Sequence, residues 1–560
     1  YSFGNNNYRI SSLGNGVYTV YSLTQNGFCA ANGNGSMYFA ASSDAAEAKW
    51  LVTKTSDGYV FQSAAHQTYM TSDAGLSSNA ENISISDLNA SVTDYSVKYD
   101  LSALNALDSL NGIQVISRLH TLGLSRSDLM NPEANMTSLN TNIQSALSGL
   151  PTQTVQYTGT DVDDLNQFLQ NNTGKIVQLT QDIQVYKNTN GSFGIIMVPS
   201  DTILDGNGHS LVMKAGYTEA PDVGVVLYVY KNGVIPSTNC GVKNLSTDIP
   251  YVNSINVFSA DNILLENNTL NNATKSGIMI SDEYGSTVNG IIRGNTINNV
   301  GDDAIAVYGN HSNLLIDSNR ISGAKGFAGI AISCLQNGQQ IRVDNETTGP
   351  HDIIVTGNVI SGCSGEALYC IGSYKTYITY NTLRDSILEG VCLDSGCIGN
   401  YFAHNEVVNN GIAGGLPGVS IDNGIYNIVD SNNVYNNSCS GIKLVRTGLG
   451  NIIVNNICTD NAYNQMGAKS SGIDIEPLAV ETENLGYIDG LGSNWNVVLN
   501  NTVTGSHDFG VFIADDDTAN NGGSSCENVI MYNKFSSAYT FGAADFSSMS
   551  STVKNNITLN

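Results

Sequence analysis

A short phrase that returns every 23 to 28 residues constrains the fold of this chain more than any other feature. From about residue 260 an Asn precedes an aliphatic residue and a polar turn, as in ENNTL at Asn268, RGNTI at Asn295 and DSNRI at Asn319. The phrase continues to KNNI at Asn556, with longer gaps where segments are inserted. A unit this short cannot bury its own apolar face, so the units must stack on one another.

A second phrase alternates with the first and indicates the secondary structure. A small residue precedes alternating aliphatic residues in GIMIS from Gly277, GIAIS from Gly329, GVSID from Gly418 and GIDIE from Gly472. This period of two is typical of short strands. Several strands in each unit, with no helix between them, predict an all-β parallel β-helix of about ten or more coils. A β-propeller or a β-sandwich is the alternative, but propeller blades repeat at about 40 to 50 residues.

The stacked Asn residues have a predicted role of their own. In a parallel β-helix, equivalent side chains of successive coils lie one above the other. Asn side chains stacked inside a turn can bond to one another as a ladder, which satisfies amides that would be costly to bury unpaired.

Three segments are expected along the chain. Residues 1–97 are predicted to form a small β domain, because a strand that begins at Trp50 is followed by an Asp-Gly turn and further strands. This domain resembles units of a β-trefoil, and it either binds carbohydrate or caps the β-helix. Residues 98–155 have helical spacing and predict a connector between the β domains. Residues 156–560 form the β-helix, with a helix over 161–172 that covers its first coil.

The repeat region is similar to a known group of proteins. With ILDGNGHSL (203–211) as an opening coil, residues from about 160 to 560 resemble the right-handed parallel β-helix superfamily of pectate lyases, polygalacturonases, fructan-cyclising transferases and phage tailspikes. The resemblance implies a right-handed β-helix in a carbohydrate-active protein. It carries little information about the reaction, because the repeat encodes stacking rather than chemistry.

The balance of charged residues limits the classes of molecule that the protein is expected to bind. The chain has 23 Lys and Arg against 49 Asp and Glu, a formal net charge of −26. This balance disfavours nucleic acid and anionic membranes, which need a basic surface, and it suits a neutral polysaccharide. No apolar run is long enough for a membrane-spanning helix, and the first residues do not read as a signal peptide. Frequent Asn-x-Ser/Thr sites favour an extracellular protein, and a dimer or trimer remains open.

Metal and cofactor sites are not expected from the cysteines. The ten Cys have neither CxxC pairs nor zinc spacing. We therefore predict no cofactor and no catalytic metal, while a structural Ca²⁺ on acidic side chains stays open.

Aligned carboxylates mark the predicted catalytic site. Equivalent positions of adjacent coils lie about 4.8 Å apart. Counting from the small residue that opens each strand makes Asp394 and Asp422 direct neighbours, and likewise Glu366 and Glu389. Two carboxylates at this distance cannot both ionise easily, so one can act as a general acid beside a nucleophile or base. A separation of about 5 Å fits retaining glycoside chemistry and a wider one inversion.

Further residues on the same face are predicted to bind substrate. The alignment places at this groove the side chains of Asp302, Asp303, Tyr308, Tyr369, Lys443, Arg446, Asp474 and Glu476. The tyrosines, with Tyr487, would offer faces for sugar rings. Insertions at 335–352, 477–495 and 515–527 follow the same strand and would build the walls. The plainer interpretation is that each carboxylate is a solvated surface group paired with Lys443 or Arg446.

The stretch GDDAIAV contains Asp302 and Asp303 and resembles the Asp-Asp motif of polygalacturonases. That family also has an Asp one coil earlier and a Gly-His-Gly one coil later. Here the earlier coil has Ser276, and the later coil, GFAGIAIS, has no His. The family triad therefore cannot be transferred, and the two residues are either a sugar subsite or turn residues that open a strand.

Three function classes follow from these patterns. The leading one is an enzyme that cleaves or transfers glycosidic bonds in a polysaccharide. The second is a uronate lyase or epimerase, for which Lys443, Arg446, Arg342 and His351 could neutralise the uronate or act as base. The third is a glycan binder without catalysis, such as an adhesin or a tailspike-like shaft.

Overall fold

The computed structural model divides the chain into two compact units, Tyr1–Thr93 and Asp94–Asn560. The sequence divided it at 97 and 155 instead. The structure describes residues 2–3, 6–14, 17–22, 27–40, 46–55, 58–66, 68–71, 75–80, 82–83, 94–187, 194–230, 233–334, 349–462, 471–477, 492–515, 523–536, 539, 541–547 and 551–559.

The first unit is a nine-stranded antiparallel sheet that runs from β1 (Ser2–Phe3) to β9 (Leu76–Ser77). Its core is built around Trp50, which is fully buried with seven other residues of the same cluster. The indole Nε1 of Trp50 donates a hydrogen bond of 2.8 Å to the carbonyl of Cys29, so the ring is buried without an unsatisfied donor.

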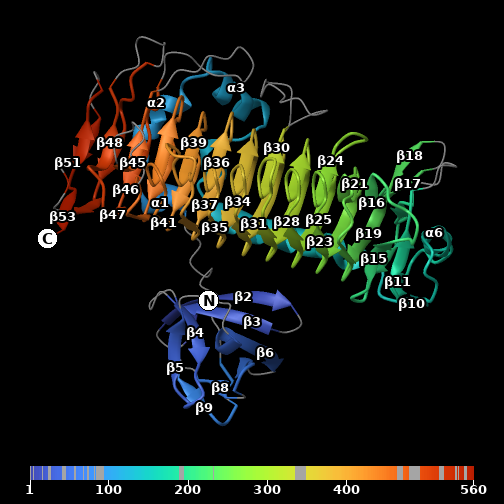
Figure 1. The fold of residues 1–560 in the computed structure, drawn as a ribbon. Helices are drawn as coiled ribbons and strands as arrows, with labels where there is room; N and C mark the ends of the chain where they lie inside the picture. The colour runs from blue at the N-terminus through green and yellow to red at the C-terminus, as the bar shows by residue number, and fades with distance from the viewer. Residues whose placement is uncertain are drawn as a thin grey trace. The chain divides into compact units, whose positions relative to one another are not determined.

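The second unit is the parallel β-helix that the repeat predicts, and the coils lie side by side along it (Figure 1). Sheet 1 has 15 strands, from β10 (Thr154–Tyr157) to β52 (Thr552–Lys554). Sheet 2 has 14, from β12 (Ile183–Val185) to β53 (Ile557–Leu559). Sheet 3 has 13 strands. These are β13 (Ile196–Met197), β16 (Val223–Val226), β21 (Asn253–Phe258), β24 (Ile278–Ser281), β27 (Ile305–Tyr308), β30 (Ile330–Ser333), β33 (Leu368–Ile371), β36 (Val391–Asp394), β39 (Val419–Asp422), β42 (Ile442–Val445), β45 (Ser471–Ile475), β48 (Phe509–Ile513) and β51 (Phe541–Asp545).

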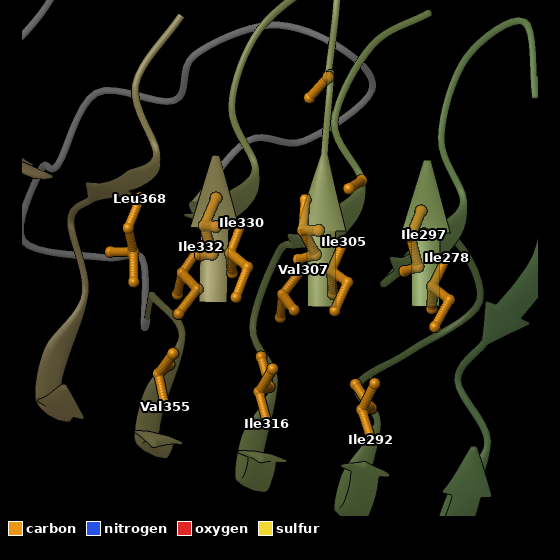
Figure 2. Packing of buried hydrophobic residues seen from close by; sticks show 14 of the residues in the cluster. Ile278, Ile292, Ile297, Ile305, Val307, Ile316, Ile330, Ile332, Val355 and Leu368 are labelled. Carbon is orange, nitrogen blue, oxygen red and sulfur yellow. The ribbon is translucent and has the colours of Figure 1, made fainter. Parts of the chain in front are cut away.

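Aliphatic side chains form columns inside the β-helix. Along sheet 3, Ile278, Ile305, Ile330 and Leu368 pair in successive coils and are fully buried. Figure 2 shows the first three beside inward-pointing residues of sheets 1 and 2, such as Ile316. Each such side chain contributes roughly 1.5–3 kcal/mol on burial, so the continuous core stabilises the stack.

Asn residues form the expected ladder inside one turn of the coils. In the middle of it, the Nδ2 of Asn405 donates to the Oδ1 of Asn432 at 3.0 Å, and Asn432 donates to Asn456 at 2.9 Å. Each Oδ1 also accepts the backbone N–H of the preceding Asn. Every rung thus satisfies a buried amide of the coil before it.

Another turn of the coils, which follows the strands of sheet 2, carries a second ladder of Asn residues. This ladder ends on a histidine. Asn410, Asn437 and Asn461 bond in succession, and the backbone N–H of Asn461 then donates to the Nε2 of His507 at 3.2 Å. The Nδ1 of His507 lies 3.2 Å from the hydroxyl of Tyr539. Because Nε2 accepts a hydrogen bond, the imidazole must be neutral in the folded protein.

We expect His507 to make the fold sensitive to acid. Burial lowers its pKa to about 4, against the opposing effects of the Thr504 carbonyl, Asp460 and Asp508. Because the pKa of His507 is lower in the folded state, its contribution to the free energy of unfolding is complete above the unfolded pKa of about 6.5. This contribution is lost as the pH falls through 4, a change of about 3 kcal/mol. Urea unfolding at pH 7.5 and pH 4.0 measures this loss. The variant His507→Asn, which cannot titrate, should lose less stability between these pH values than the wild type; an equal loss would contradict the assignment.

Helices cover the outer face of sheet 1. They are α1 (Tyr95–Lys98), α2 (Asn105–Asp108), α3 (Gln114–Thr121), α4 (Arg126–Leu129) and α5 (Pro132–Ala146). Their apolar residues pack with outward residues of sheet 1, such as Ile354 and Tyr401, in one buried cluster. The expected connector is therefore a layer of the larger unit. None of the helices in the described residues is long and apolar enough to cross a membrane.

The helix expected at the start of the β-helix is α6 (Val162–Asn171). The Asp161 side chain caps it by accepting the N–H of Asp163 at 2.9 Å. Its apolar face joins the core of the first coils, and α6 lies beside β10 and β11 (Ile176–Leu179) at one end of the stack (Figure 1).

Candidate functional site

The strand register places the predicted carboxylates on neighbouring coils. Asp394 at the end of β36 pairs with Ile371 on β33, while Leu393 pairs with Ile421. Asp394 and Asp422 therefore end adjacent strands. At the opposite ends of the strands, the N–H of Ala367 donates to the carbonyl of Glu389 at 3.1 Å, which aligns Glu366 with Glu389. Both predicted pairs are thus adjacent on the outer face of sheet 3.

Arg446 joins the two aspartates. Its Nη1 donates to the Oδ2 of Asp422 in a close contact and lies 4.0 Å from the Oδ1 of Asp394. The residue follows β42 directly and has a φ of 65°, a left-handed conformation that is uncommon for a side chain of this size. This turn sends the guanidinium back over the aspartates of the two preceding coils.

Asp394 is surrounded by donors. The hydroxyl of Tyr369 donates to its Oδ2 and that of Ser395 to its Oδ1, both at 2.7 Å. Donors at both oxygens are what an ionised carboxylate requires. Ser395 was not predicted, although its place directly after a strand-ending Asp was a usable signal. Tyr369 is 7% exposed and its ring packs edge-on against Phe327, so it presents no open face to a sugar.

Three buried acids on this face have an oxygen without a partner. Within the described residues, the Oε2 of Glu366, the Oδ1 of Asp422 and the Oδ1 of Asp474 make no hydrogen bond. Buried polar atoms are rarely left unsatisfied, because each costs about 1–3 kcal/mol. Three such oxygens on one face are a feature expected of a site that receives hydroxyl groups from a ligand.

The acids cannot all be ionised together. Burial, reinforced by Glu389, raises the pKa of Glu366 to about 7. Burial also raises the pKa of Glu389. For Asp422, burial and the charge of Asp394 raise the pKa despite the ion pair with Arg446. One guanidinium cannot balance these carboxylates, so the cluster retains a proton near neutral pH.

Lys443 belongs to a second group on the next coils. Its Nζ lies 2.7 Å from the Oε2 of Glu476 and 3.9 Å from the Oδ2 of Asp474. Burial lowers the pKa of Lys443, but these two acids raise it by more. Ser440, which the sequence did not single out, donates to Asp474 at 3.3 Å. The positive charge of Lys443 is thus already balanced by two carboxylates.

Asp302 and Asp303 lie at the start of β27, several coils before Arg446. Asp303 is fully buried, accepts the hydroxyl of Tyr308, and accepts the N–H of Ala328 from the next coil at 2.9 Å. Burial raises its pKa to about 7. Asp302 is a half-exposed turn residue. The side-chain hydrogen bonds of Asp303 thus go to Tyr308 and Ala328 rather than to Arg446, Asp394 or Asp422, but its charge helps to raise the pKa of Glu366, two coils further along the stack.

Other predicted residues lie elsewhere. His351 begins β31 (His351–Thr356) on sheet 1, where its ring stacks on Tyr374 at 4.6 Å. Most residues of the three insertions that were predicted to form the walls of the groove lie outside the described residues, and these include Arg342 and Tyr487. Within the described residues no group of three or more His, Cys, Asp and Glu side chains is arranged to hold a metal. All ten Cys side chains are buried.

Comparisons with known proteins agree with this architecture. The family model described as "Right handed beta helix region" matches residues 226–348. No curated protein sequence matches the chain. Among solved structures, an Azotobacter vinelandii mannuronan C-5 epimerase A-module is 14% identical, with 72% of this chain and 100% of that one covered at a TM-score of 0.40.

Two other solved structures show the same kind of likeness. A double mutant of the tailspike protein of E. coli bacteriophage HK620 is 15% identical, with 71% of this chain and 73% of that one covered at a TM-score of 0.43. A periplasmic alginate epimerase is 11% identical, with 75% and 88% covered at a TM-score of 0.38. These similarities concern the fold alone. The three parallel sheets show that the larger unit is a parallel β-helix, and the region that the right-handed β-helix model matches lies within it.

Proposed function

We propose that the chain is a polysaccharide-active enzyme that cleaves or transfers glycosidic bonds at the outer face of sheet 3. One observation carries the proposal. Glu366 and Asp422 each present a buried carboxyl oxygen without a partner among the described residues, while nearby Asp394 is fully supplied with donors. Glu366 and Asp394 stand at opposite ends of adjacent strands, and the charge of Asp394 helps to raise the pKa of Glu366. A protonated acid that shares a face with an ionised one fits the division of roles that glycoside chemistry requires.

The roles follow from the environments. Glu366, with its pKa raised to about 7, holds a proton that it can give to the glycosidic oxygen as the bond to the anomeric carbon breaks. Asp394 is the base or nucleophile at the anomeric carbon. A water molecule or a sugar hydroxyl completes the reaction, and its proton returns to a carboxylate. Arg446 keeps Asp394 and Asp422 in place and limits their repulsion.

A second candidate is proton abstraction from a uronate, as in a lyase or an epimerase. Arg446 favours it, because a guanidinium binds carboxylates well. However, the two described cations at the aspartates and at Glu476, which are Arg446 and Lys443, already contact acids. The net charge of −26 also repels a polyuronate. We therefore propose a neutral polysaccharide as the substrate and a site of action outside the cytoplasm.

A glycan panel with mass analysis of the products tests the proposal. The panel contains neutral polymers (β-glucan, xylan, galactomannan, dextran, inulin) and two uronate polymers (alginate, polygalacturonate). We expect a neutral polymer to give shorter chains that have gained water, or rearranged chains with no net mass change. Products that absorb as unsaturated sugars, or uronates changed without cleavage, would support the second candidate instead. Intact polymers throughout the panel would overturn both.

A further inference from the structure

An aromatic cluster lies around one end of β21, a strand of sheet 3 nearer to the first coils than the acids are. Phe258, which ends β21, stacks with Tyr228 of β17 (Tyr228–Tyr230) at 5.4 Å and contacts Tyr284 edge-on at 5.8 Å. The Tyr284 side chain is 49% exposed, and the other two are half-buried. Figure 1 places β17 and β21 together near the end of the stack opposite β51.

Hydrogen bonds hold the turn that carries Tyr284 in place. The N–H of Gly285 donates to the carbonyl of Asp282 at 2.9 Å, and the Ser259 hydroxyl donates to the carbonyl of Gly285. The N–H of Asn310 in the next coil donates to the Oδ2 of Asp282 at 3.1 Å. The exposed ring is therefore fixed before any ligand arrives, which reduces the entropy lost on binding.

Polar groups border the aromatic surface. Glu283 is exposed beside Tyr284, and the charges of Tyr284 and Glu283 add to burial in raising the pKa of Tyr228. A flat apolar face with hydroxyl and carboxylate groups at its edge matches a pyranose ring, whose faces carry C–H groups and whose edge carries hydroxyls.

The cluster is in register with the candidate catalytic site. Successive strand pairings connect Phe258, Ser281, Tyr308, Ser333, Ile371 and Asp394 in one column. Five steps of about 4.8 Å place Phe258 about 24 Å from Asp394 along the stack. A ligand that reaches both places must span several sugar rings.

We propose that Tyr228, Phe258, Tyr284 and Glu283 form a distal subsite that binds one sugar ring of a long polysaccharide whose scissile bond lies at the acidic cluster. This inference rests on the proposed function. It specifies the substrate class: the enzyme acts on polymers and prefers them to short oligosaccharides, because only a polymer gains the additional stacking contact.

The experiment compares Tyr284→Ala with Tyr217→Ala. Tyr217 is a second exposed tyrosine of the same unit, but its ring contacts Tyr186 at a tilted angle and lies outside the cluster. On the neutral polymer that the panel identifies, Tyr284→Ala should lower the ratio of kcat/KM for polymer to kcat/KM for a trisaccharide about tenfold, by loss of one stacking contact. Tyr217→Ala should leave this ratio unchanged. An unchanged ratio for Tyr284→Ala, or an equal fall for Tyr217→Ala, would overturn the subsite.

A binding measurement separates this inference from the proposed function. In affinity electrophoresis through gels that contain each neutral polymer of the panel, the wild type should be retarded by one of them and Tyr284→Ala should be retarded less. This result supports the subsite even if no polymer is turned over, in which case only the proposed function fails. Equal retardation of the two proteins, or retardation by none of the polymers, overturns the subsite.

Discussion

Replacing Glu366 by Gln is expected to lower turnover of the susceptible glycan about 100- to 10 000-fold, the usual contribution of a general acid. Glu366 is 6% exposed, and burial with the nearby Glu389 keeps it protonated near neutral pH. Gln has the same shape as the protonated acid and no proton to give, so the fold should persist while the acid is lost. Steady-state rates with unchanged thermal unfolding would establish this.

The matched control for this change is Glu406→Gln. Glu406 begins β38 (Glu406–Val408) on sheet 2 and accepts the hydroxyl of Tyr435 at 2.7 Å, away from the acidic cluster. Its replacement should leave the rate as it is. If Glu366→Gln retained full activity, the assigned acid would be wrong, whatever the reaction.

The pH profile supplies an independent readout of the same group. Because the pKa of Glu366 is raised to about 7, the wild-type rate should fall as pH rises through 7, where the acid loses its proton. The residual activity of Glu366→Gln should lack this decline. A wild-type rate that keeps rising from pH 6 to pH 9 would contradict the role.

Replacing Asn432 by Ala is expected to destabilise the β-helix by about 4 kcal/mol, because several buried groups lose their partners together. The Oδ1 of Asn432 accepts the N–H and the Nδ2 of Asn405. Its Nδ2 donates to the carbonyl of Phe402 and to Asn456. All of these bonds are buried, so water does not replace them.

Urea unfolding of the variant beside Asn433→Ala measures this effect. Asn433 is the adjacent residue, half-exposed at the start of β41 (Asn433–Tyr435), and its loss should cost under about 1 kcal/mol. Equal losses for the two variants would mean that the ladder does not stabilise the stack.

The repeat in the sequence determined most of the larger unit. Each GIMIS-like phrase became a strand of sheet 3 with the expected inward aliphatic residues. The repeated Asn residues became ladder rungs, except that in SNNV the rung is Asn432 and not the predicted Asn433. Local periodicity is sufficient here, because a strand's period of two decides which side chains point inward, and the recurring phrase marks the equivalent positions of each coil. The register read from the sequence correctly predicts that Asp394 and Asp422 lie on neighbouring coils.

The tertiary structure alone decided how these side chains contact one another. The positive φ of Arg446 brings its guanidinium back to Asp422, and Tyr369 is buried with its hydroxyl on Asp394. The unpartnered oxygens and the raised pKa of Glu366 depend on burial and on charges from coils more than 20 residues away in sequence. Local sequence patterns report strand direction and spacing, whereas burial and electrostatics are sums over non-local neighbours, so only the packed coils could determine them.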